Sequence, residues 1–242
     1  MDQLTLLQRD DSIAVFNKPA GLLVHRSWID RHETRFALQL ARDQLGQRVY
    51  PVHRLDKPTS GVLLFALSPE AATRLTAAFS TGEVHKRYLG ICRGVLPSEG
   101  TIDYPLLEEQ DRHDPHRQEG KDPQEAVTTY RRLATLELPF AVGRYPTSRY
   151  SLVEAEPLTG RRHQIRRHFK HIFHPLVGDV NYGEGRHNRF FREEFDCPRL
   201  LLHAAELAFP HPADAQPVRF TAPLDCTFSR VIGSLGWSML LE

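Results

Sequence analysis

The chain has 242 residues, of which 31 are Lys or Arg and 30 are Asp or Glu, so its formal net charge is +1. A hydrophobic content of 40% and a charged content of 25% are typical of globular proteins and exclude a disordered, collagenous or coiled-coil chain. Since the chain as a whole is not a polycation, any binding of nucleic acid must come from a local basic patch.

Neither a membrane span nor an export signal is predicted. The apolar run 62–67 is far shorter than the roughly 20 residues of a membrane helix. Residues 1–11 have no cationic start and no sustained apolar core, so we expect a cytoplasmic protein without membrane contact. Cys92, Cys197 and Cys226 form no C-x-x-C pair, which argues against a disulfide framework or a cysteine zinc site.

Apolar runs and turn residues predict the elements in the first half of the chain. Asp30 and Glu33 have the spacing of a capping box, which predicts a helix that begins after Asp30. The run 62–67 is typical of a strand buried on both faces. The predicted elements are, in order, a strand over 13–17, an extended stretch over 22–24, a helix ending at Gly46, a strand over 62–67 and a helix from Ser68 to Gly82.

The second half also mixes strands and helices. Residues 108–125 carry charge, His, Pro and Gly, which predicts an exposed loop or hairpin tip. A domain boundary there is less favoured, because the strand-rich patterns on either side would each make a thin core alone. A strand is predicted over 150–157 and a helix from Thr159-Gly160, with Ile165, Phe169, Ile172 and Phe173 on one apolar face. We therefore expect an α+β fold.

Basic residues are concentrated between Arg144 and His174. This segment holds seven Lys and Arg residues against two acidic residues, a net charge of +5, whereas 24 basic and 28 acidic residues elsewhere leave −4. Such a run is typical of a solvated helix face or of a nucleic-acid contact. On a helical wheel centred on Ile165, Arg166 lies at the edge of the apolar stripe. The residues predicted on the opposite face are His163, Arg167 and Lys170.

The histidines of this segment lack a metal-binding pattern. His168, His171 and His174 are three residues apart with no acid among them, unlike H-E-x-x-H. The chain also lacks a glycine-rich phosphate loop and the G-x-S-x-G elbow of serine hydrolases. We therefore expect neither a metal nor a cofactor.

One motif is similar to that of a known family. Residues 53–61, His-Arg-Leu-Asp-Lys-Pro-Thr-Ser-Gly, resemble the H-R-L-D-x-x-T-S-G signature of the RluA-type pseudouridine synthases. Five further blocks follow in the family's order: 17–25, 86–88, 159–166, 174–179 and 202–204. The resemblance implies an isomerase that converts uridine to pseudouridine in RNA. It also implies a mixed, largely antiparallel sheet with flanking helices and a central active-site cleft.

Two loops resemble a subgroup of the family. Residues 25–28 and 144–147, with no added N-terminal RNA-binding domain, are similar to the members that modify uridine 65 of tRNA. The resemblance implies a single catalytic domain over 1–242, with tRNA as its partner. It implies no obligate protein partner, and we expect a monomer.

Pseudouridine formation breaks the bond from ribose to N1 of uracil, turns the base and rejoins it through C5. This reaction requires a carboxylate beside the sugar, an aromatic floor for the base and a cation that holds the carboxylate ionised. The resemblance assigns these roles to Asp56, Tyr88 and Arg166. Asp56 acts as nucleophile or as base at the sugar. Taken alone, an Asp before Pro58 is more typical of a turn cap, and only the surrounding blocks favour the catalytic role. Tyr88 stacks on the base and can take the C5 proton, and Arg166 pairs with Asp56.

The target uridine must leave its stem before it reacts. The resemblance implies that Arg54 fills the gap left by the flipped base, because a planar guanidinium stacks well; a plain phosphate contact is the alternative. Leu202 is implied as an apolar wall of the pocket and is expected in the core on any interpretation. The other residues predicted to contact RNA are His53, Arg161, Arg162, His163, Arg167 and Lys170.

Three rival functions remain. A synthase of ribosomal RNA or of another tRNA position shares the catalytic blocks, since only flanking loops choose the substrate. A non-catalytic RNA-binding protein is disfavoured by the intact Asp56, Tyr88 and Arg166. A metal-dependent hydrolase is disfavoured by the missing ligand pattern.

Overall fold

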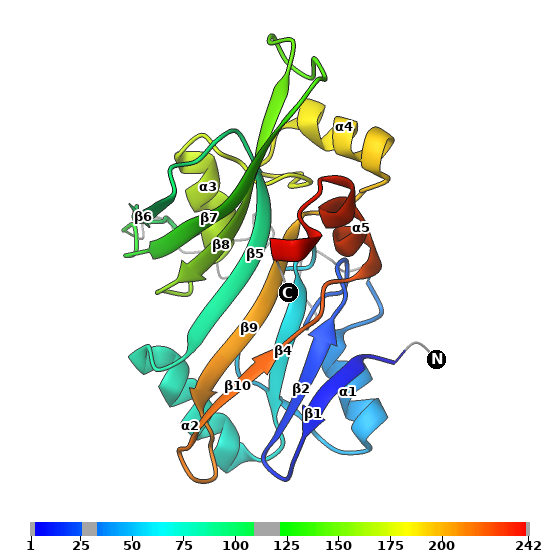
Figure 1. The fold of residues 1–242 in the computed structure, drawn as a ribbon. Coiled ribbons are helices and arrows are strands. Elements are labelled where there is room, and N and C mark those ends of the chain that lie inside the picture. The colour runs from blue at the N-terminus through cyan, green and yellow to red at the C-terminus, as the bar shows by residue number, and fades with distance from the viewer. Residues whose placement is uncertain (1–2, 26–32, 109–121, 241–242) are drawn as a thin grey trace. The chain divides into compact units, whose positions relative to one another are not determined.

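The computed structural model of the protein describes residues 3–25, 33–108 and 122–240 (Figure 1). Its elements are, in chain order, β1 (Thr5–Arg9), β2 (Ile13–Lys18), α1 (Ala37–Leu45), β3 (Tyr50–Pro51), β4 (Ser60–Ala66), α2 (Pro69–Thr81), β5 (His85–Arg93), β6 (Glu99–Asp103), β7 (Val127–Leu138), β8 (Ser148–Pro157), α3 (Gln164–His171), α4 (Gly185–Phe195), β9 (Leu202–Pro210), β10 (Pro217–Thr221), α5 (Cys226–Ser234) and the 3-10 helix η1 (Ser238–Leu240). Among these described helices, none has the length and apolar character needed to cross a membrane. The cytoplasmic location and the monomeric state stay predictions.

The chain divides into two compact units, whose segments alternate along the sequence. Unit 1 comprises Met1–Lys86, Pro105–Gln124 and Ala204–Pro223, and unit 2 comprises Arg87–Tyr104, Glu125–His203 and Leu224–Glu242. The strand order is β1-β2-β4-β9-β5-β8-β7-β6, with β10 paired to β9 and β3 to β4. The neighbours β1–β2, β2–β4, β5–β8, β7–β8 and β6–β7 are antiparallel. The predicted α+β fold with a largely antiparallel sheet is confirmed, whereas the single domain and the central cleft stay predictions.

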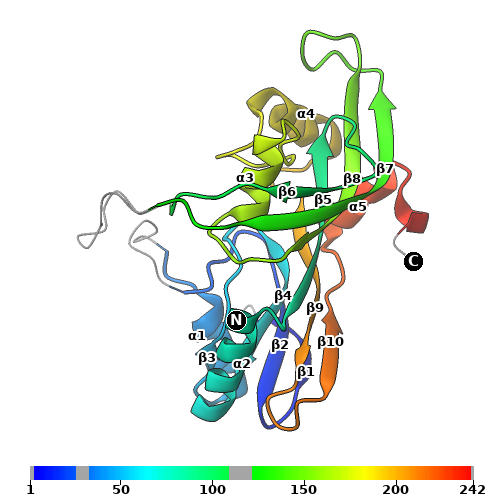
Figure 2. The same ribbon diagram turned by 90° about the vertical axis from the view of Figure 1, so that its left-hand side faces the viewer.

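In unit 1, every residue of β4 is buried. Successive side chains of a strand point to opposite faces. Val62 and Leu64 belong to the core that includes α2, whereas Leu63 and Phe65 belong to the core that includes α1. The prediction of a strand covered on both faces is therefore confirmed, and Figure 2 shows both helices beside the strands of this unit.

The two helices of unit 1 begin in different ways. The Ser68 hydroxyl accepts the Ala71 N–H at 3.1 Å and α2 ends at Gly82, as predicted. In contrast, α1 begins at Ala37 without a side-chain cap, so the predicted start after Asp30 is wrong; Asp30 itself lies outside the described residues. The first amides of α1, those of residues 37 and 38, donate instead to the carbonyls of residues 23 and 24 at 2.8 and 3.0 Å. The predicted extended stretch over 22–24 thus supplies the backbone cap of this helix.

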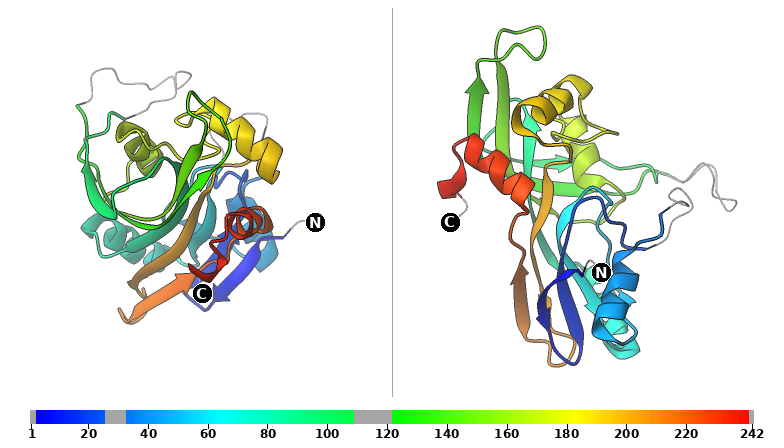
Figure 3. Two further views of the ribbon diagram at one scale, coloured as in Figure 1. Left: turned by 45° about the horizontal axis from the view of Figure 1, so that its top comes forward. Right: turned by 90° about the vertical axis from the view of Figure 1, so that its right-hand side faces the viewer.

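In unit 2, β8 separates two cores. Tyr150 and Leu152 pack with α5, whereas Val153 and Ala155 pack with α3. Because alternate residues of a strand face opposite ways, the two helices cover opposite faces of β8, as Figure 3 shows. The strand predicted over 150–157 is thereby confirmed.

Helix α3 is shorter than the sequence predicts. It begins at Gln164, after His163 adopts a left-handed backbone with φ of 55°, and it ends at His171. The His174 amide donates to the Phe169 carbonyl at 2.9 Å, which closes the helix with Phe173 at φ of 63°. Phe173 is consequently 80% exposed, and its predicted place on the buried face is wrong.

The stretch 108–125 is described only at its ends. Leu106 and Gln124 exchange two backbone hydrogen bonds of 2.8 and 3.0 Å, which pair the two chain segments as at the base of a hairpin. The predicted exposed tip falls mainly on residues 109–121, which lie outside the described residues.

Candidate active site

Asp56 lies in the loop of unit 1 between β3 and β4, and it is half-buried. The Thr59 amide donates to the Asp56 backbone carbonyl at 3.0 Å, so the main chain closes a turn over 56–59. Leu55 before the turn and Thr59 after it are buried, at 4% and 2% exposure. The loop is therefore fixed on both sides of the carboxylate.

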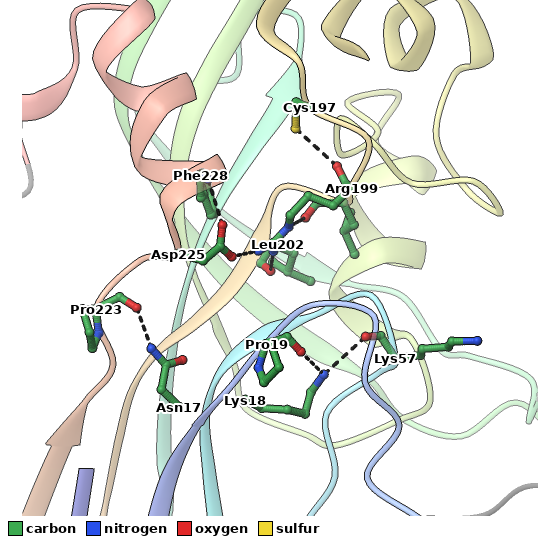
Figure 4. A network of polar contacts seen from close by, with 11 residues as sticks. Asn17, Lys18, Pro19, Lys57, Cys197, Arg199, Leu202, Pro223, Asp225 and Phe228 are labelled. Atoms are coloured by element: carbon green, nitrogen blue, oxygen red, sulfur yellow. Dashed lines mark hydrogen bonds and ion pairs between the residues drawn. The ribbon is translucent and has the colours of Figure 1, made fainter. Parts of the chain in front are cut away.

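Lys18, in the family block 17–25, makes hydrogen bonds to this loop. Its side chain is fully buried, and its Nζ donates to the carbonyls of Pro19 and Lys57 at 2.9 and 3.3 Å (Figure 4). It also donates to the Leu22 carbonyl at 2.8 Å. The Gly21 amide donates to the same Lys57 carbonyl at 2.8 Å. A buried ammonium is tolerated only when polar groups surround it. Lys18 thus fixes the residue that follows Asp56, a role that the sequence did not predict.

His53 holds the start of the loop against β4. Its Nε2 accepts the Leu64 N–H at 2.9 Å, and its ring stacks on Phe79 with 5.1 Å between centroids. Burial, together with the positive charge of Lys86, lowers the pKa of His53 to about 4. The ring is therefore a neutral acceptor, and the structure gives His53 a scaffolding role within unit 1. Its predicted contact with RNA stays a prediction. Arg54 beside it is exposed, as a residue that meets a substrate must be.

The low pKa of His53 makes stability depend on pH. The folded chain keeps His53 neutral down to about pH 4, whereas the unfolded chain binds the proton near pH 6.5. Neutral His53 therefore makes its full contribution to the free energy of unfolding above about pH 6.5. As the pH falls towards about 4, this free energy decreases by about 2–3 kcal/mol. Urea unfolding at neutral and at mildly acidic pH measures this loss. We expect a smaller loss in His53→Gln, whose amide can still accept the Leu64 N–H, and an equal loss would contradict the assignment.

Tyr88 and Leu202 share one core in unit 2. Tyr88 lies in β5 opposite Ala155 of β8, and it is half-buried at the edge of the core that contains Leu202. Leu202 is 3% exposed, as expected of a core residue. Arg199 donates to the Leu202 carbonyl at 3.0 Å and also pairs with Asp225 (Figure 4), so the first residue of β9 is held firmly. An aromatic side chain and an apolar wall are thus placed together.

Arg166 forms a buried ion pair with Asp179 in unit 2. Its Nε and Nη2 donate to the two carboxylate oxygens at 2.7 and 2.9 Å, and it is 3% exposed. The Asp179 carboxylate also accepts the amides of Asn181 and Tyr182, both at 3.0 Å. Burial raises the pKa of Asp179, but Arg166 and these amides outweigh it and hold the pKa below its ordinary value. The guanidinium is therefore fixed in orientation by two hydrogen bonds.

Tyr182 is in contact with three of the predicted site residues. Its hydroxyl is 2.8 Å from His163 Nδ1, and the Arg166 guanidinium lies 5.0 Å from the centroid of its ring. The Lys170 ammonium lies 5.8 Å from the same centroid. The sequence missed both Asp179 and Tyr182. Asp179 stands in one of the family blocks, but no spacing shows that it faces Arg166.

A buried polar chain fixes α3 on β7. Gln164 donates to the Thr128 hydroxyl at 3.0 Å, and that hydroxyl lies 2.9 Å from His168 Nδ1. The Nε2 atom of His168 is 3.1 Å from the Tyr104 carbonyl, and burial lowers the pKa of His168. His168 is thus a structural residue of this chain of contacts. Over the described ranges no three His, Cys, Asp or Glu side chains are grouped as metal ligands.

The other basic residues of the segment differ in their surroundings. Arg161 is exposed, and its Nε donates to the Glu125 carbonyl at 2.9 Å. Arg162 and Arg167 are half-buried, and Lys170 is exposed. The wheel puts Arg166 at the edge of the apolar stripe, and the structure buries it. Of the residues predicted on the opposite face, Lys170 is exposed, whereas His163 and Arg167 are half-buried. Because Asp56 belongs to unit 1 and Arg166 to unit 2, their pairing stays a prediction.

Comparison with known proteins gives consistent matches. Residues 12–171, which include Asp56, Tyr88 and Arg166, match the RNA pseudouridylate synthase family. The tRNA pseudouridine synthase C of Vibrio cholerae is 49% identical over 235 residues, covering 97% of this chain and 96% of that protein. That of Pasteurella multocida is 51% identical over 237 residues, covering 98% of each. Among solved structures, human RNA pseudouridylate synthase domain containing 1 is 28% identical with a TM-score of 0.69, covering 93% of this chain and 86% of that one.

Proposed function

The chain belongs to the RNA pseudouridylate synthase family, and we propose that it converts uridine 65 of tRNA to pseudouridine. The relatives that are 49% and 51% identical over nearly the whole chain are named tRNA pseudouridine synthase C, which supports tRNA as the substrate. The observation that carries the proposal is the loop of Asp56. The family signature puts the Asp56 carboxylate on a turn, and Lys18 of the family block 17–25 holds the carbonyl of the next residue, Lys57.

The reaction is an isomerisation, so the product has the same atomic composition as the uridine. Asp56 acts at the sugar, as nucleophile or as base, while the bond between C1′ of ribose and N1 of uracil breaks. The released base turns, and a bond forms between C1′ and C5. The proton at C5 is then removed and N1 gains one, which restores the neutral base. Tyr88 provides the aromatic surface for the loose base and can accept the C5 proton.

Arg166 orients the reacting carboxylate in this proposal. Asp179 holds the guanidinium through Nε and Nη2, and the ring of Tyr182 lies 5.0 Å from it. A guanidinium presents five donors in a rigid plane, so a second partner can be served from a fixed position. Asp179 is thus a positioning residue, which acts through Arg166.

Arg166→Lys is expected to slow turnover about 100-fold while tRNA affinity changes much less. A lysine cannot make two parallel hydrogen bonds to a carboxylate, and a small misplacement at a reacting centre has a cost of this size. Single-turnover rates and filter binding with an unmodified tRNA transcript measure the two effects. The matched control is Arg167→Lys, a half-buried neighbour that should keep both values within about twofold. Equal rate losses in the two variants would contradict the role of Arg166.

The function itself is tested by mapping pseudouridine. Purified protein is incubated with an unmodified tRNA transcript, and RNA from cells with and without the gene is mapped in parallel. We expect pseudouridine at position 65 of tRNA only where the protein is present. Pseudouridine at a ribosomal position or elsewhere in tRNA would favour the rival synthase. No pseudouridine in any RNA would favour a non-catalytic RNA-binding protein.

A further inference from the structure

Unit 2 contains a pocket that shares no residue with the candidate active site. Its volume is about 600 Å³, within the usual range for ligand sites. It is lined by residues 143–147 of the β7–β8 connection, by the first two residues of β8, by the end of β5, by Glu137 of β7 and by the start of α4. The hairpin of β7 and β8 and the neighbouring α4 are seen together in Figure 1.

The lining is basic. It includes Arg93, Arg144, Arg149 and Arg186 against Glu137 and Glu184. Both carboxylates are already engaged within the pocket wall. Glu184 forms an ion pair with Arg93, and Glu137 accepts the Thr147 hydroxyl at 2.6 Å.

Two guanidinium groups remain available to a ligand. Arg149 and Arg186 are exposed, and neither side chain makes a hydrogen bond or ion pair with the described part of the chain. They come from β8 and α4, so two separate elements present a cation to one cavity. His187 beside them adds no further charge, because burial lowers its pKa and its Nδ1 is engaged by the Tyr150 hydroxyl at 2.7 Å.

The pocket also has an exposed aromatic ring. Tyr145 is 55% exposed, and the Arg144 guanidinium lies 4.8 Å from the centroid of its ring. Arg144 also donates to the Tyr145 hydroxyl at 2.6 Å. Aromatic rings beside cations are typical surfaces for bases of single-stranded RNA, because every base has a π face.

We propose that this pocket binds a nucleotide of the RNA substrate other than the reactive uridine. Backbone phosphate is bound by Arg149 and Arg186, and a base stacks on Tyr145. The inference rests on the proposed function in that the substrate is RNA. A chain with a net charge of +1 must place its phosphate contacts locally, and this cavity combines cations with a stacking surface.

The test removes both cations together. Arg149→Ala combined with Arg186→Ala should weaken binding of an unmodified tRNA transcript about tenfold. The slope of log affinity against log salt should become shallower by about one to two, since each lost phosphate contact reduces it by about one. Turnover at saturating tRNA should be unchanged, because the pocket contains no catalytic residue. The matched control combines Arg189→Ala and Arg192→Ala, two exposed arginines of α4 that do not line the pocket.

Stacking is tested separately at Tyr145. Tyr145→Phe should bind tRNA as the wild type does, whereas Tyr145→Ala should bind severalfold more weakly. Melting temperatures verify folding; if the arginine-to-alanine pair fails to fold, the corresponding glutamine pair is measured instead.

The outcomes distinguish this inference from the proposed function. Equal affinities and salt slopes in the pocket double variant and the control double variant would contradict RNA binding by the pocket, even where the wild type forms pseudouridine. Wild-type protein that binds tRNA but modifies no uridine overturns the function, and the binding comparison still decides the pocket.

Discussion

Asp56→Asn is expected to abolish pseudouridine formation while tRNA still binds. Asparagine keeps the size of the side chain but has no carboxylate to act at the sugar, so the rate should fall on the order of 10³-fold or more. Affinity should stay near the wild-type value, because a single carboxylate adds nothing to the attraction for phosphates. Single-turnover assays and gel shifts with one unmodified tRNA transcript measure both quantities.

The control for this variant is Asp11→Asn, which neutralises an exposed aspartate of the same unit. Its turnover should equal that of the wild type. Because the main chain of residue 56 closes its turn, the substitution should leave the loop intact and the melting temperature nearly unchanged. Turnover by Asp56→Asn near the wild-type rate would remove Asp56 from the chemistry.

Gly61→Ala is expected to destabilise the protein by about 3 kcal/mol or more. Gly61 has φ of 114°, a backbone conformation that side chains rarely adopt, and an added Cβ would lie 2.1 Å from the Ala204 carbonyl oxygen. That oxygen is backbone, so relief requires β4 or β9 to move, which adds the cost of overpacking. Urea unfolding of both proteins at one pH measures the loss.

Gly82→Ala separates backbone strain from steric conflict. Gly82 also has a positive φ, 79°, but no atom lies within 4 Å of an added Cβ. The variant should therefore lose only about 1 kcal/mol. If both variants lost the same free energy of unfolding, the close approach of Ala204 to Gly61 would not contribute to the loss.

Where local rules decide, the sequence is sufficient. The apolar run 62–67 specifies a strand covered on both faces, and the Ser68-Pro69 start with the Gly82 stop specifies α2. The family blocks show the family, which the match over residues 12–171 confirms, whereas the roles that they imply for Asp56, Tyr88 and Arg166 stay predictions.

The sequence predicts the ends of helices wrongly where backbone groups from elsewhere in the chain decide where a helix begins or ends. Helix α1 begins at Ala37 because carbonyls of residues 23 and 24 cap it, which overrides the spacing of Asp30 and Glu33. Helix α3 closes before Phe173, although the apolar period continues through it. A period of 3.6 residues predicts a face but not the residue at which a helix ends.

The sequence alone is enough to predict the fold class, the buried strand β4, the motif that contains Asp56 and the exposed position of Lys170 on α3. The three-dimensional structure is needed to see that Asp179 holds Arg166, that Lys18 supports the Asp56 loop and that Gly61 has no room for a side chain beside Ala204. Local patterns follow from the hydrogen bonds and side-chain directions of neighbouring residues. Contacts between residues far apart in sequence depend on the whole path of the backbone, which no local pattern contains.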